Sequence, residues 1–411
     1  MNYNKILDIA TDVGYRLAIN GAEIFRVEES IRRILSAYGI SAQVFAIPNC
    51  LIVSTETPDG TPISKMRRIQ ASETDIASVE QYSDLSRKIC AEIPDPEIAE
   101  QWIKDTDNAH MSYKTAIVLT GYFFSAAGFA VFFGGGWIEF LVAGLCGLLT
   151  GVFLRFLNRF HVNPFFATTA AAFSLAIIAY FVGGLIVPCN VDAIITGTLM
   201  ILVPGLLFTN AMRDIIFGDT NSGINRIVQV LLIAAAIALG TGAAWNLANS
   251  SWNMAATESV IQVNMMLQCA AAFIGCTGFL VVFNVHGAGA LLCSLGSFLV
   301  WVVYSLILHF SGNELLGYFI ASLFSAIYSE VMARIRKKPA IAYLVVSMFP
   351  LLPGAGIYYT ANHLVRGDIS KFASTGTHTI AIAGTLAVGM LLVSTVVRLW
   401  YSWKSRHISK T

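Results

Sequence analysis

The chain has 411 residues, of which 56% are hydrophobic and only 12% are charged, and its formal net charge is +1 at pH 7. Soluble domains are roughly 45–50% apolar and 25% charged, so this composition indicates a membrane protein. No block of Lys and Arg alternates with aromatic residues. Together with the near-zero net charge, this excludes nucleic acid as an expected partner.

The first 14 residues mix Lys5, Asp8 and Asp12 with apolar side chains. They lack the uninterrupted hydrophobic core of a signal peptide, so we expect the N-terminus to stay in the cytoplasm. The seven cysteines are scattered, without a C-x-x-C motif or a paired spacing. Neither a disulfide framework nor a zinc site is therefore expected, and we expect no metal and no cofactor.

Residues 1–112 carry most of the charge and are predicted to form a small cytoplasmic α+β domain. Asn20 is predicted to cap a helix that ends at Gly39, with Glu23 at the third helical position of a capping box. The other elements expected here are strands at 42–47, 51–55 and 62–69, a helix at about 76–90, and a last helix after Pro94 and Pro96.

From residue 115 onward, apolar segments of about 20 residues follow one another, each long enough to cross about 30 Å of hydrocarbon. We predict an α-helical polytopic membrane protein with ten spans, with nine or eleven as the alternatives, centred near residues 124, 146, 176, 201, 236, 272, 297, 322, 350 and 385. The spans are assigned to two membrane repeats of five spans each, 113–260 and 261–411, and the second repeat includes a cytoplasmic tail.

The positions of Lys and Arg support this count, because cytoplasmic loops carry an excess of positive charge. The outside loops of the ten-span arrangement contain only Arg366 and Lys371. Both chain termini are therefore predicted to be cytoplasmic. The inside loops and the tail contain Arg155, Arg159, Arg213, Arg226, Arg334, Arg336, Lys337, Lys338, Arg398, Lys404, Arg406 and Lys410.

A duplicated segment indicates an internal repeat. Residues 203–205 (Val-Pro-Gly) are followed by Gly218 and Asp219, and residues 352–354 (Leu-Pro-Gly) are followed by Gly367 and Asp368. Pro and Asp are 15 residues apart in both copies, and the copies are offset by 149 residues. They fall on the fourth and ninth predicted spans, so the repeat unit is five spans, and an odd unit must invert. Inverted five-span repeats are found in secondary transporters, whose substrates bind near the midplane beside interrupted helices.

Each Pro-Gly pair is predicted to interrupt its helix, because Pro removes a backbone donor and freed backbone groups in lipid need new partners. A proline kink that only aids packing is the alternative. The polar residues after each break suit a zwitterion, since a half-helix N-terminus favours a carboxylate and Asp or carbonyl oxygens can hold an ammonium. The expected substrate-binding residues are Pro204, Gly205, Thr209, Asn210, Pro353, Gly354, Tyr359, Thr360 and Asn362, with Asn210 preferred among the polar ones.

Coupling to protons requires an ionisable group that changes its charge within the membrane. Two histidines titrate in a useful range, although a lone histidine is more often a packing residue. The charged residues near the breaks either take part in coupling or pair with each other in the headgroup zone. The candidates for coupling or gating are Arg213, Asp214, Asp219, His363, Asp368 and His378.

The run from Gly21 to Glu28, Gly-Ala-Glu-Ile-Phe-Arg-Val-Glu, with Ile31, Ile34 and Gly39 after it, resembles the opening signature of the threonine/serine exporter family. The segments 65–69 and 72–89 are also similar to that family, as is the order of a cytoplasmic domain followed by ten spans with the Pro-Gly repeat. The resemblance covers nearly the whole chain.

The resemblance implies secondary-active export of threonine and serine across the bacterial plasma membrane, driven by the proton motive force. The implied partners are the small-molecule substrate, protons and the lipid bilayer. Related proteins that carry the two parts as separate chains are associated with export of dicarboxylates such as succinate, so a dicarboxylate exporter stays open as an alternative.

The N-terminal motif consists of Gly21, Glu23, Arg26 and Glu28. It could serve a gate, a regulatory ligand or a docking surface, or simply stabilise its helix. Glu23 and Glu28 are five residues apart and point in different directions on a helix, and no nucleophile accompanies them, so we predict no enzyme. A membrane-anchored sensor or enzyme and a channel are the rival classes. The soluble domain could mediate self-association into a homo-oligomer.

Overall fold

The computed structural model of the chain describes residues 2–70, 73–252, 264–287, 289–336, 338 and 340–408. It forms two compact units, Met1–Tyr113 with Phe283–His286, and Lys114–Val282 with Gly287–Thr411. The predicted boundary between the membrane repeats, at 260/261, lies outside the described residues. So do Lys337 and Lys410, and the side chains of Arg398, Lys404 and Arg406.

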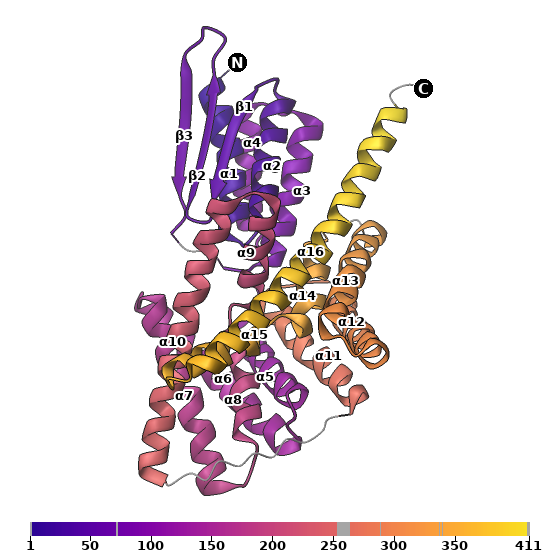
Figure 1. Cartoon of the computed structure of the whole chain (residues 1–411). Helices are drawn as coiled ribbons and strands as arrows, with labels where there is room; N and C mark the ends of the chain where they lie inside the picture. Colours follow the sequence, from indigo (N-terminus) through magenta and orange to yellow (C-terminus); the bar gives the residue numbers. More distant parts are fainter. Residues whose placement is uncertain are drawn as a thin grey trace. The chain divides into compact units, whose positions relative to one another are not determined.

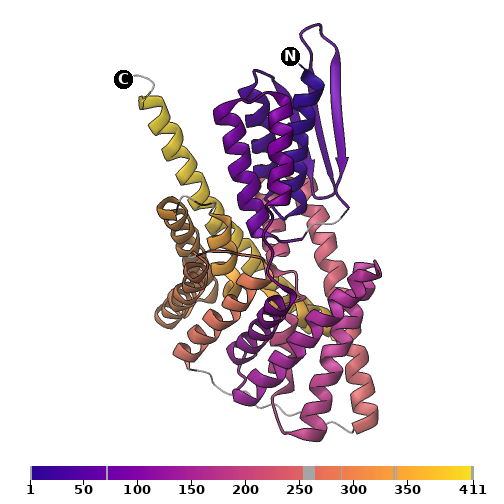
Figure 2. The same cartoon turned by 180° about the vertical axis from the view of Figure 1, so that it is seen from behind.

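The first unit contains, among its described residues, four helices and a three-stranded antiparallel sheet in the order β1-β2-β3 (Figure 1). Helices α1 and α2 pack on the sheet, and α3 and α4 pack on α1 (Figure 2). The elements are α1 (Tyr3–Ile19), α2 (Ile24–Ala37), β1 (Ala42–Ile47), β2 (Cys50–Glu56), β3 (Pro62–Arg68), α3 (Ile76–Glu92) and α4 (Pro96–Asn108).

The core of this unit follows the helical and strand periodicities of the sequence. Val27, Ile31 and Ile34 recur at helical spacing on α2 and are completely buried. On β2, Leu51 and Val53 are buried, because alternate residues of a strand point to the same face. Strand β1 has the bounds predicted from the sequence, β2 is one residue longer than predicted at each end, and β3 ends one residue earlier than predicted.

The predicted start of the second helix is wrong. Asn20 is the C-cap of α1, where its Nδ2 donates a hydrogen bond to the carbonyl oxygen of Arg16 at 2.7 Å, and Glu23 is the N-cap of α2. Gly21, with φ of +87°, turns the chain between the two helices. No helix was predicted for the residues of α1, and Asn20 stands at the C-terminal end of this helix.

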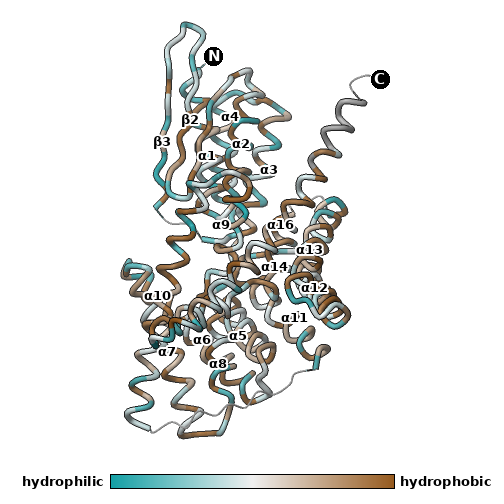
Figure 3. The backbone as a smooth tube through the Cα atoms, viewed as in Figure 1, coloured by the Kyte–Doolittle hydropathy of each residue, from teal (hydrophilic) through white to brown (hydrophobic). Residues whose placement is uncertain are grey.

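The second unit is built from helices, and they are mostly apolar (Figure 3). Its elements are α5 (Thr115–Phe132), α6 (Trp137–Arg159), α7 (Pro164–Phe181), a π-helical turn (Val182–Ile186), α8 (Val191–Leu199), α9 (Gly205–Phe217), α10 (Thr220–Trp252), α11 (Met265–Val282), α12 (Ala290–Ser311), α13 (Glu314–Arg336), α14 (Ile341–Met348), a 3-10 turn (Phe349–Leu351), α15 (Gly354–Val365) and α16 (Ile369–Ile408).

Among the described residues, eight helices are long and apolar enough to cross a membrane. The segments Ile341–Leu351 and Gly354–Val365, bent by 48°, make a ninth span if they are counted together. The chain is therefore a polytopic helical membrane protein, but ten spans are not confirmed. The predicted span near residue 201 falls between α8 and α9, and α8 has nine residues. A helix of that length rises only about 14 Å, less than half the hydrocarbon thickness.

The order of helices repeats along the second unit. Three long helices, a short broken pair and a long helix form α5–α10, and α11–α16 follow the same order. Helices α7 and α13 begin at residues 164 and 314, and α9 and α15 begin at residues 205 and 354. The duplicated sequence segment therefore belongs to a repeated series of helices. Inversion of the two halves across the membrane stays a prediction.

The first helices of the two halves, α5 and α11, cross at a very short distance. A β-carbon on Gly128 would lie 2.4 Å from the backbone nitrogen of Gly275, and one on Gly278 would lie 2.5 Å from the carbonyl oxygen of Gly121. Backbone atoms cannot move aside cheaply, so this crossing requires glycine. Small residues allow such close helix packing in membranes.

Candidate functional site

Both Pro-Gly pairs interrupt helices, as predicted. Pro204 is the N-cap of α9 with φ of −84° and ψ of 48°, and Pro353 is the N-cap of α15 with φ of −75° and ψ of 45°. At each break the glycine N–H bonds the carbonyl oxygen two residues earlier, at 3.0 Å for Gly205 and 2.7 Å for Gly354. The two copies of the sequence repeat thus share one local conformation.

The two breaks lie against each other. A β-carbon on Gly205 would lie 3.1 Å from Cβ of Leu352 and 3.8 Å from Cα of Gly354. A β-carbon on Gly354 would lie 3.0 Å from Sδ of Met200. Segments that are about 150 residues apart in the chain therefore meet through glycine at the start of α9 and α15.

A cavity of about 740 Å³ opens beside the second break. Its volume lies within the roughly 300–1,000 Å³ of small-molecule sites. Its wall is largely aromatic and aliphatic, with a few polar side chains and one turn of α15 backbone. The lining residues are Phe129, Phe132, Phe133, Gly134, Met200, Gln268, Trp301, Tyr318, Pro350, Leu352, Pro353, Ala355, Gly356, Tyr359, Thr375, His378, Thr379 and Ile382.

The start of α15 gives this cavity an electropositive wall. Pro353 is the N-cap, and Ala355 and Gly356 of the first helical turn line the cavity. The first N–H groups of a helix have no partner within the helix and carry partial positive charge. This part of the wall suits a carboxylate.

One ionisable pair borders the same cavity. Nε2 of His378 on α16 lies 3.2 Å from Oε2 of Glu314 on α13, and both side chains are partly exposed. His378 lines the cavity. A protonated imidazole and a carboxylate attract each other, whereas loss of either charge removes that attraction. The pair can therefore link protonation to the packing of α13 on α16.

Tyr359 connects the two halves of the second unit. Its hydroxyl donates a hydrogen bond to Oδ2 of Asp192 at 2.7 Å and lies 3.2 Å from Oγ1 of Thr196. Asp192 and Thr196 belong to α8, and Tyr359 belongs to α15. This contact fixes a cavity-lining side chain to a helix of the other half.

The structure places the predicted substrate residues in two groups. Pro353 and Tyr359 line the cavity, and Gly354 and Gly205 form the contact between the breaks beside Pro204. The others are not part of this lining. Thr209 and Thr360 bond the carbonyl oxygens of Gly205 and Gly356, while Asn210 and Asn362 lie on α9 and α15. For these four residues, substrate contact stays a prediction.

Of the predicted coupling residues, His378 is at the cavity and the others are elsewhere. Asp214 is buried, and its Oδ2 lies 3.1 Å from Nε of Arg226 and accepts a hydrogen bond from Ser222 at 3.2 Å. Its Oδ1 lies 4.0 Å from Nη2 of Arg213. These contacts fit the alternative that the charged residues near the first break pair with each other.

Near the second break, Asp368 pairs with Lys371 at 3.5 Å. His363 lies in the last turn of α15, and Asp219 follows α9 and is exposed. None of these three belongs to the cavity lining, and a role in coupling or gating stays a prediction for each.

Several cavity residues were not among those predicted from the sequence. Gln268 accepts a hydrogen bond from Nε1 of Trp301 at 3.3 Å, and the Trp301 ring packs 4.5 Å from that of Phe132. Glu314 was missed as the partner of His378. A polar Gln within an apolar span was the available signal, because such residues usually face a cavity or the bundle interior.

The N-terminal motif has a structural use in the first unit. Glu28 accepts a hydrogen bond from the backbone N–H of Ala46 at 3.0 Å and pairs with Arg32 at 2.5 Å, which ties α2 to β1. Gly21 forms the turn before α2, Glu23 caps that helix, and Arg26 is half-buried on it. This arrangement favours the stabilising interpretation for Gly21, Glu23 and Glu28.

Comparison with known proteins points to one family. The family model described as "Putative threonine/serine exporter" matches residues 8–248, and the one described as "Threonine/Serine exporter, ThrE" matches residues 268–396. The chain is 22% identical over 408 residues to the "Threonine/serine exporter" of Corynebacterium glutamicum, covering 96% of this chain and 82% of that one.

It is also 20% identical over 416 residues to the "Probable threonine/serine exporter" of Mycobacterium tuberculosis (strain ATCC 25618 / H37Rv), covering 96% and 77% of the two chains. No solved structure matches the chain. The first family model alone spans more than half of the chain. The chain therefore belongs to the threonine/serine exporter family.

Proposed function

We propose that this protein is a secondary-active exporter of threonine and serine, and that the cavity at the Pro353 break holds the substrate. The cavity is the observation that carries the proposal, because it combines a suitable volume with the free first turn of α15. The substrate carboxylate would meet the N–H groups of Ala355 and Gly356. Gln268 and Thr379 offer polar partners for the hydroxyl and the ammonium.

Proton coupling is assigned to His378 and Glu314. The two side chains join α16 to α13 at the cavity, so a change in their protonation would alter the contact between these helices as well as the cavity. The proton motive force would then drive export by favouring one packing of α13 on α16 over the other.

In this proposal the two helix breaks move against each other during alternating access. The halves α5–α10 and α11–α16 would have inverted topology, with both chain termini in the cytoplasm of a bacterial cell. Contact through Gly205 and Gly354 supports this, because a small-residue contact between the breaks permits sliding without large side-chain rearrangement.

The test is counterflow in proteoliposomes that contain the purified full-length protein. Vesicles are loaded with threonine, serine, succinate or buffer, and uptake of the matching label is followed with and without a pH gradient. Threonine or serine counterflow that responds to the gradient is expected. Succinate counterflow alone would replace the amino acid with a dicarboxylate. No counterflow of any of these would refute the carrier and favour a sensor or a channel.

A further inference from the structure

The first unit contains a second cavity, of about 430 Å³, that the proposed transport cycle does not use. Side chains from α1, β3, α3 and α4 form its wall, and nearly all of them can hydrogen-bond or carry charge. The volume lies in the range of small-molecule sites. The lining residues are Asp12, Tyr15, Arg16, Ile19, Asn20, Arg67, Ser78, Gln81, Tyr82, Asp107 and His110.

The charges around this cavity balance. Arg16 and Arg67 supply two positive charges, and Asp12 and Asp107 supply two negative charges. A ligand with a large net charge would leave uncompensated charge in a confined site. A ligand that carries one positive and one negative group would not.

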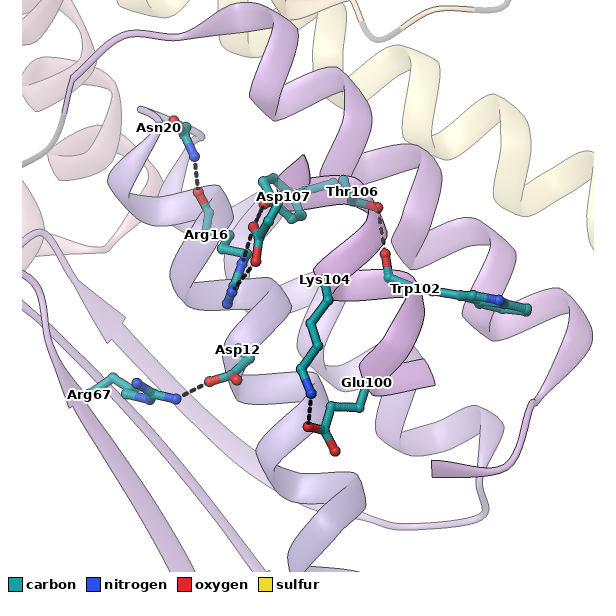
Figure 4. Close-up of polar contacts among 10 residues, drawn as sticks. Asp12, Arg16, Asn20, Arg67, Glu100, Trp102, Lys104, Thr106 and Asp107 are labelled. Atoms are coloured by element: carbon teal, nitrogen blue, oxygen red, sulfur yellow. Dashed lines mark hydrogen bonds and ion pairs between the residues drawn. The ribbon is translucent and has the colours of Figure 1, made fainter. Parts of the chain in front are cut away.

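One of the two ion pairs is saturated. Arg16 donates hydrogen bonds from Nε and Nη2 to the two carboxylate oxygens of Asp107, at 2.8 and 2.6 Å. The hydroxyl of Tyr82 donates to the same carboxylate. The hydrogen bond from Arg16 lowers the pKa of Asp107, so the pair stays charged. Figure 4 shows Arg16 and Asp107 facing each other between α1 and α4. This pair forms a fixed wall.

The other ion pair is open. Arg67 on β3 reaches Asp12 on α1 through Nη2 (Figure 4). Its Nε is buried and has no hydrogen-bond partner in the part of the chain that the structure describes. The guanidinium also lies 5.6 Å from the centre of the Tyr15 ring. A buried donor without an acceptor is costly, and a carboxylate is the acceptor that best matches a guanidinium.

We propose that this cavity binds a small zwitterionic amino acid, with the ligand carboxylate on Arg67 and the ligand ammonium on Asp12. The ligand would insert into the single existing Arg67–Asp12 contact, give each partner a group of opposite charge, and satisfy the buried donor. The choice of threonine and serine as first ligands rests on the proposed function, whereas the zwitterionic class rests on the cavity itself.

A chain of contacts leads from this cavity to the segment that follows α11. His110, which lines the cavity, lies 3.4 Å from Oδ2 of Asp75. Both carboxylate oxygens of Asp75 accept hydrogen bonds of 3.1 Å from Nδ2 of Asn284. Asn284 belongs to the segment Phe283–His286 of the same unit, which follows α11 directly in the chain. Helix α11 also supplies Gln268 to the membrane cavity.

Hydrogen–deuterium exchange of the full-length protein tests the site, because it reports on each segment separately. L-Threonine is added over a concentration series and exchange is compared with the free protein. We expect slower exchange in residues 8–20 of α1 and 62–70 of β3. Threoninol, which lacks the carboxylate, and 3-hydroxybutyrate, which lacks the amine, should give no protection there. Equal protection by either analogue would overturn the zwitterionic assignment.

Matched variants separate this site from general stabilisation. Arg67→Gln and Asp12→Asn should each raise the threonine concentration needed for half-maximal protection by about ten-fold or more, because each removes a charge-assisted contact. Arg68→Gln should leave it unchanged, since Arg68 is exposed next to Arg67. Asp8→Asn should also leave it unchanged, although it breaks the similar Asp8–Lys65 pair between the same elements. Equal loss in the control variants would overturn the proposal.

The result is independent of the proposed transport function. Protection of α1 and β3 without threonine counterflow would retain this site and remove the exporter assignment. Counterflow without protection, at threonine concentrations that saturate transport, would refute the site and leave the exporter assignment intact. If Arg67→Gln changes the exchange of the ligand-free protein, Asp12→Asn alone decides the outcome.

Discussion

Tyr359 takes part both in the wall of the membrane cavity and in a contact between the two halves. It lines the cavity and its hydroxyl bonds Asp192 of α8. Tyr359 is half-buried. Removal of this single oxygen changes the polarity of the cavity wall without opening a large void.

We predict that Tyr359→Phe lowers threonine counterflow by about ten-fold, because a hydrogen bond to a charged group contributes roughly 1.5–3 kcal/mol. Initial rates of counterflow in proteoliposomes measure the change. Tyr358→Phe is the matched control, since Tyr358 is buried in the apolar core beside Ala244 and Ile194 and does not line the cavity. Equal losses in both variants would contradict a specific role for Tyr359.

A second prediction at the residue scale concerns acid stability of the first unit. The hydrogen bond from Arg16 lowers the pKa of Asp107 below its unfolded value. Its contribution to stability is therefore complete above the unfolded pKa of about 3.9, and it is lost as the pH falls through the lower folded pKa. Asp107→Asn removes the ion pair with Arg16 and should therefore be less stable than the wild type at pH 7. The loss should be only about 1 kcal/mol, because the carboxylate is partly exposed and solvent weakens the ion pair.

The difference between the wild type and Asp107→Asn should shrink below about pH 4. Denaturant titrations followed by hydrogen exchange of α1 and α4 at several pH values measure it. Glu29 pairs with Arg33 within α2 and is as exposed as Asp107, so Glu29→Gln serves as the control with little effect. A constant difference across the pH range would contradict the assignment.

At the scale of elements, the second unit is organised by helix crossings that only glycine permits. The α5–α11 crossing brings backbone atoms of Gly128 and Gly275 together, and at the breaks a β-carbon on Gly205 would lie 3.1 Å from Cβ of Leu352. Both contacts join a helix of one half to the matching helix of the other. The small size of the residues at a few positions, more than their polarity, therefore decides how the two halves of the second unit pack together.

We predict that Gly128→Ala destabilises the membrane unit by about 1–3 kcal/mol or more, because the new methyl group meets backbone atoms of Gly275 at 2.4 Å. Thermal unfolding in detergent measures the loss. Gly384→Ala on α16 is the control, since its β-carbon would lie 3.8 Å from the flexible end of Met212. A melting temperature of Gly128→Ala equal to that of Gly384→Ala would show that α5 and α11 do not cross closely.

At the scale of the whole molecule, the proposed mechanism requires that proton binding and substrate exchange use the same cavity but separate groups. His378, Tyr359 and the start of α15 line the cavity, and Glu314 is linked to it by its contact with His378. Exchange of substrate for substrate needs no net proton movement. Gradient-driven transport does, so the two assays report on different residues.

We predict that Glu314→Gln and His378→Gln keep threonine counterflow within about two-fold but abolish threonine transport driven by a pH gradient, since each replaces a titratable side chain with a neutral one. Transport assays with and without the gradient check this. Glu330→Gln is the control, because Glu330 lies on the same helix and pairs with Arg334 away from the cavity. A full response in both variants would exclude this pair as the coupling site.

The segment Phe283–His286 supports another prediction at this scale. Asn284 donates to Asp75 and to the carbonyl oxygen of Met111 at 2.9 Å, and its Oδ1 accepts from the backbone N–H of Tyr113 at 3.3 Å. Asn284→Asp replaces a donor with a carboxylate that faces Asp75 and should cost about 2–4 kcal/mol. Faster hydrogen exchange of residues 283–286 measures it.

Asn284→Gly tests the backbone alone in the same assay, because Asn284 has φ of +56°, which glycine adopts readily. It removes the side-chain contacts without adding a repulsive charge, so it should raise the exchange of residues 283–286 by less than Asn284→Asp does. Unchanged exchange in both variants would contradict the hydrogen-bonded role of this side chain.

The amino-acid sequence by itself determined the features that depend on neighbours along the chain. Apolar length places eight of the predicted spans on continuous helices, alternation places β1 at 42–47, and the missing N–H of Pro204 and Pro353 places the two helix breaks. The start of α2 was missed because Asn20 suits a helix end as well as a helix start.

Only the tertiary structure decided which of the polar residues share a site. Tyr359 and His378 reach the cavity, whereas Asn210 lies outside its lining, and Glu314 becomes relevant only through its contact with His378. Helices α13 and α16 begin 55 residues apart, and no local pattern records that they meet. Hydrophobic periodicity indicates which face of a helix or strand is buried, but it does not indicate which distant segment packs against that face. Burial and charge pairing between distant segments are therefore decided only in the packed chain.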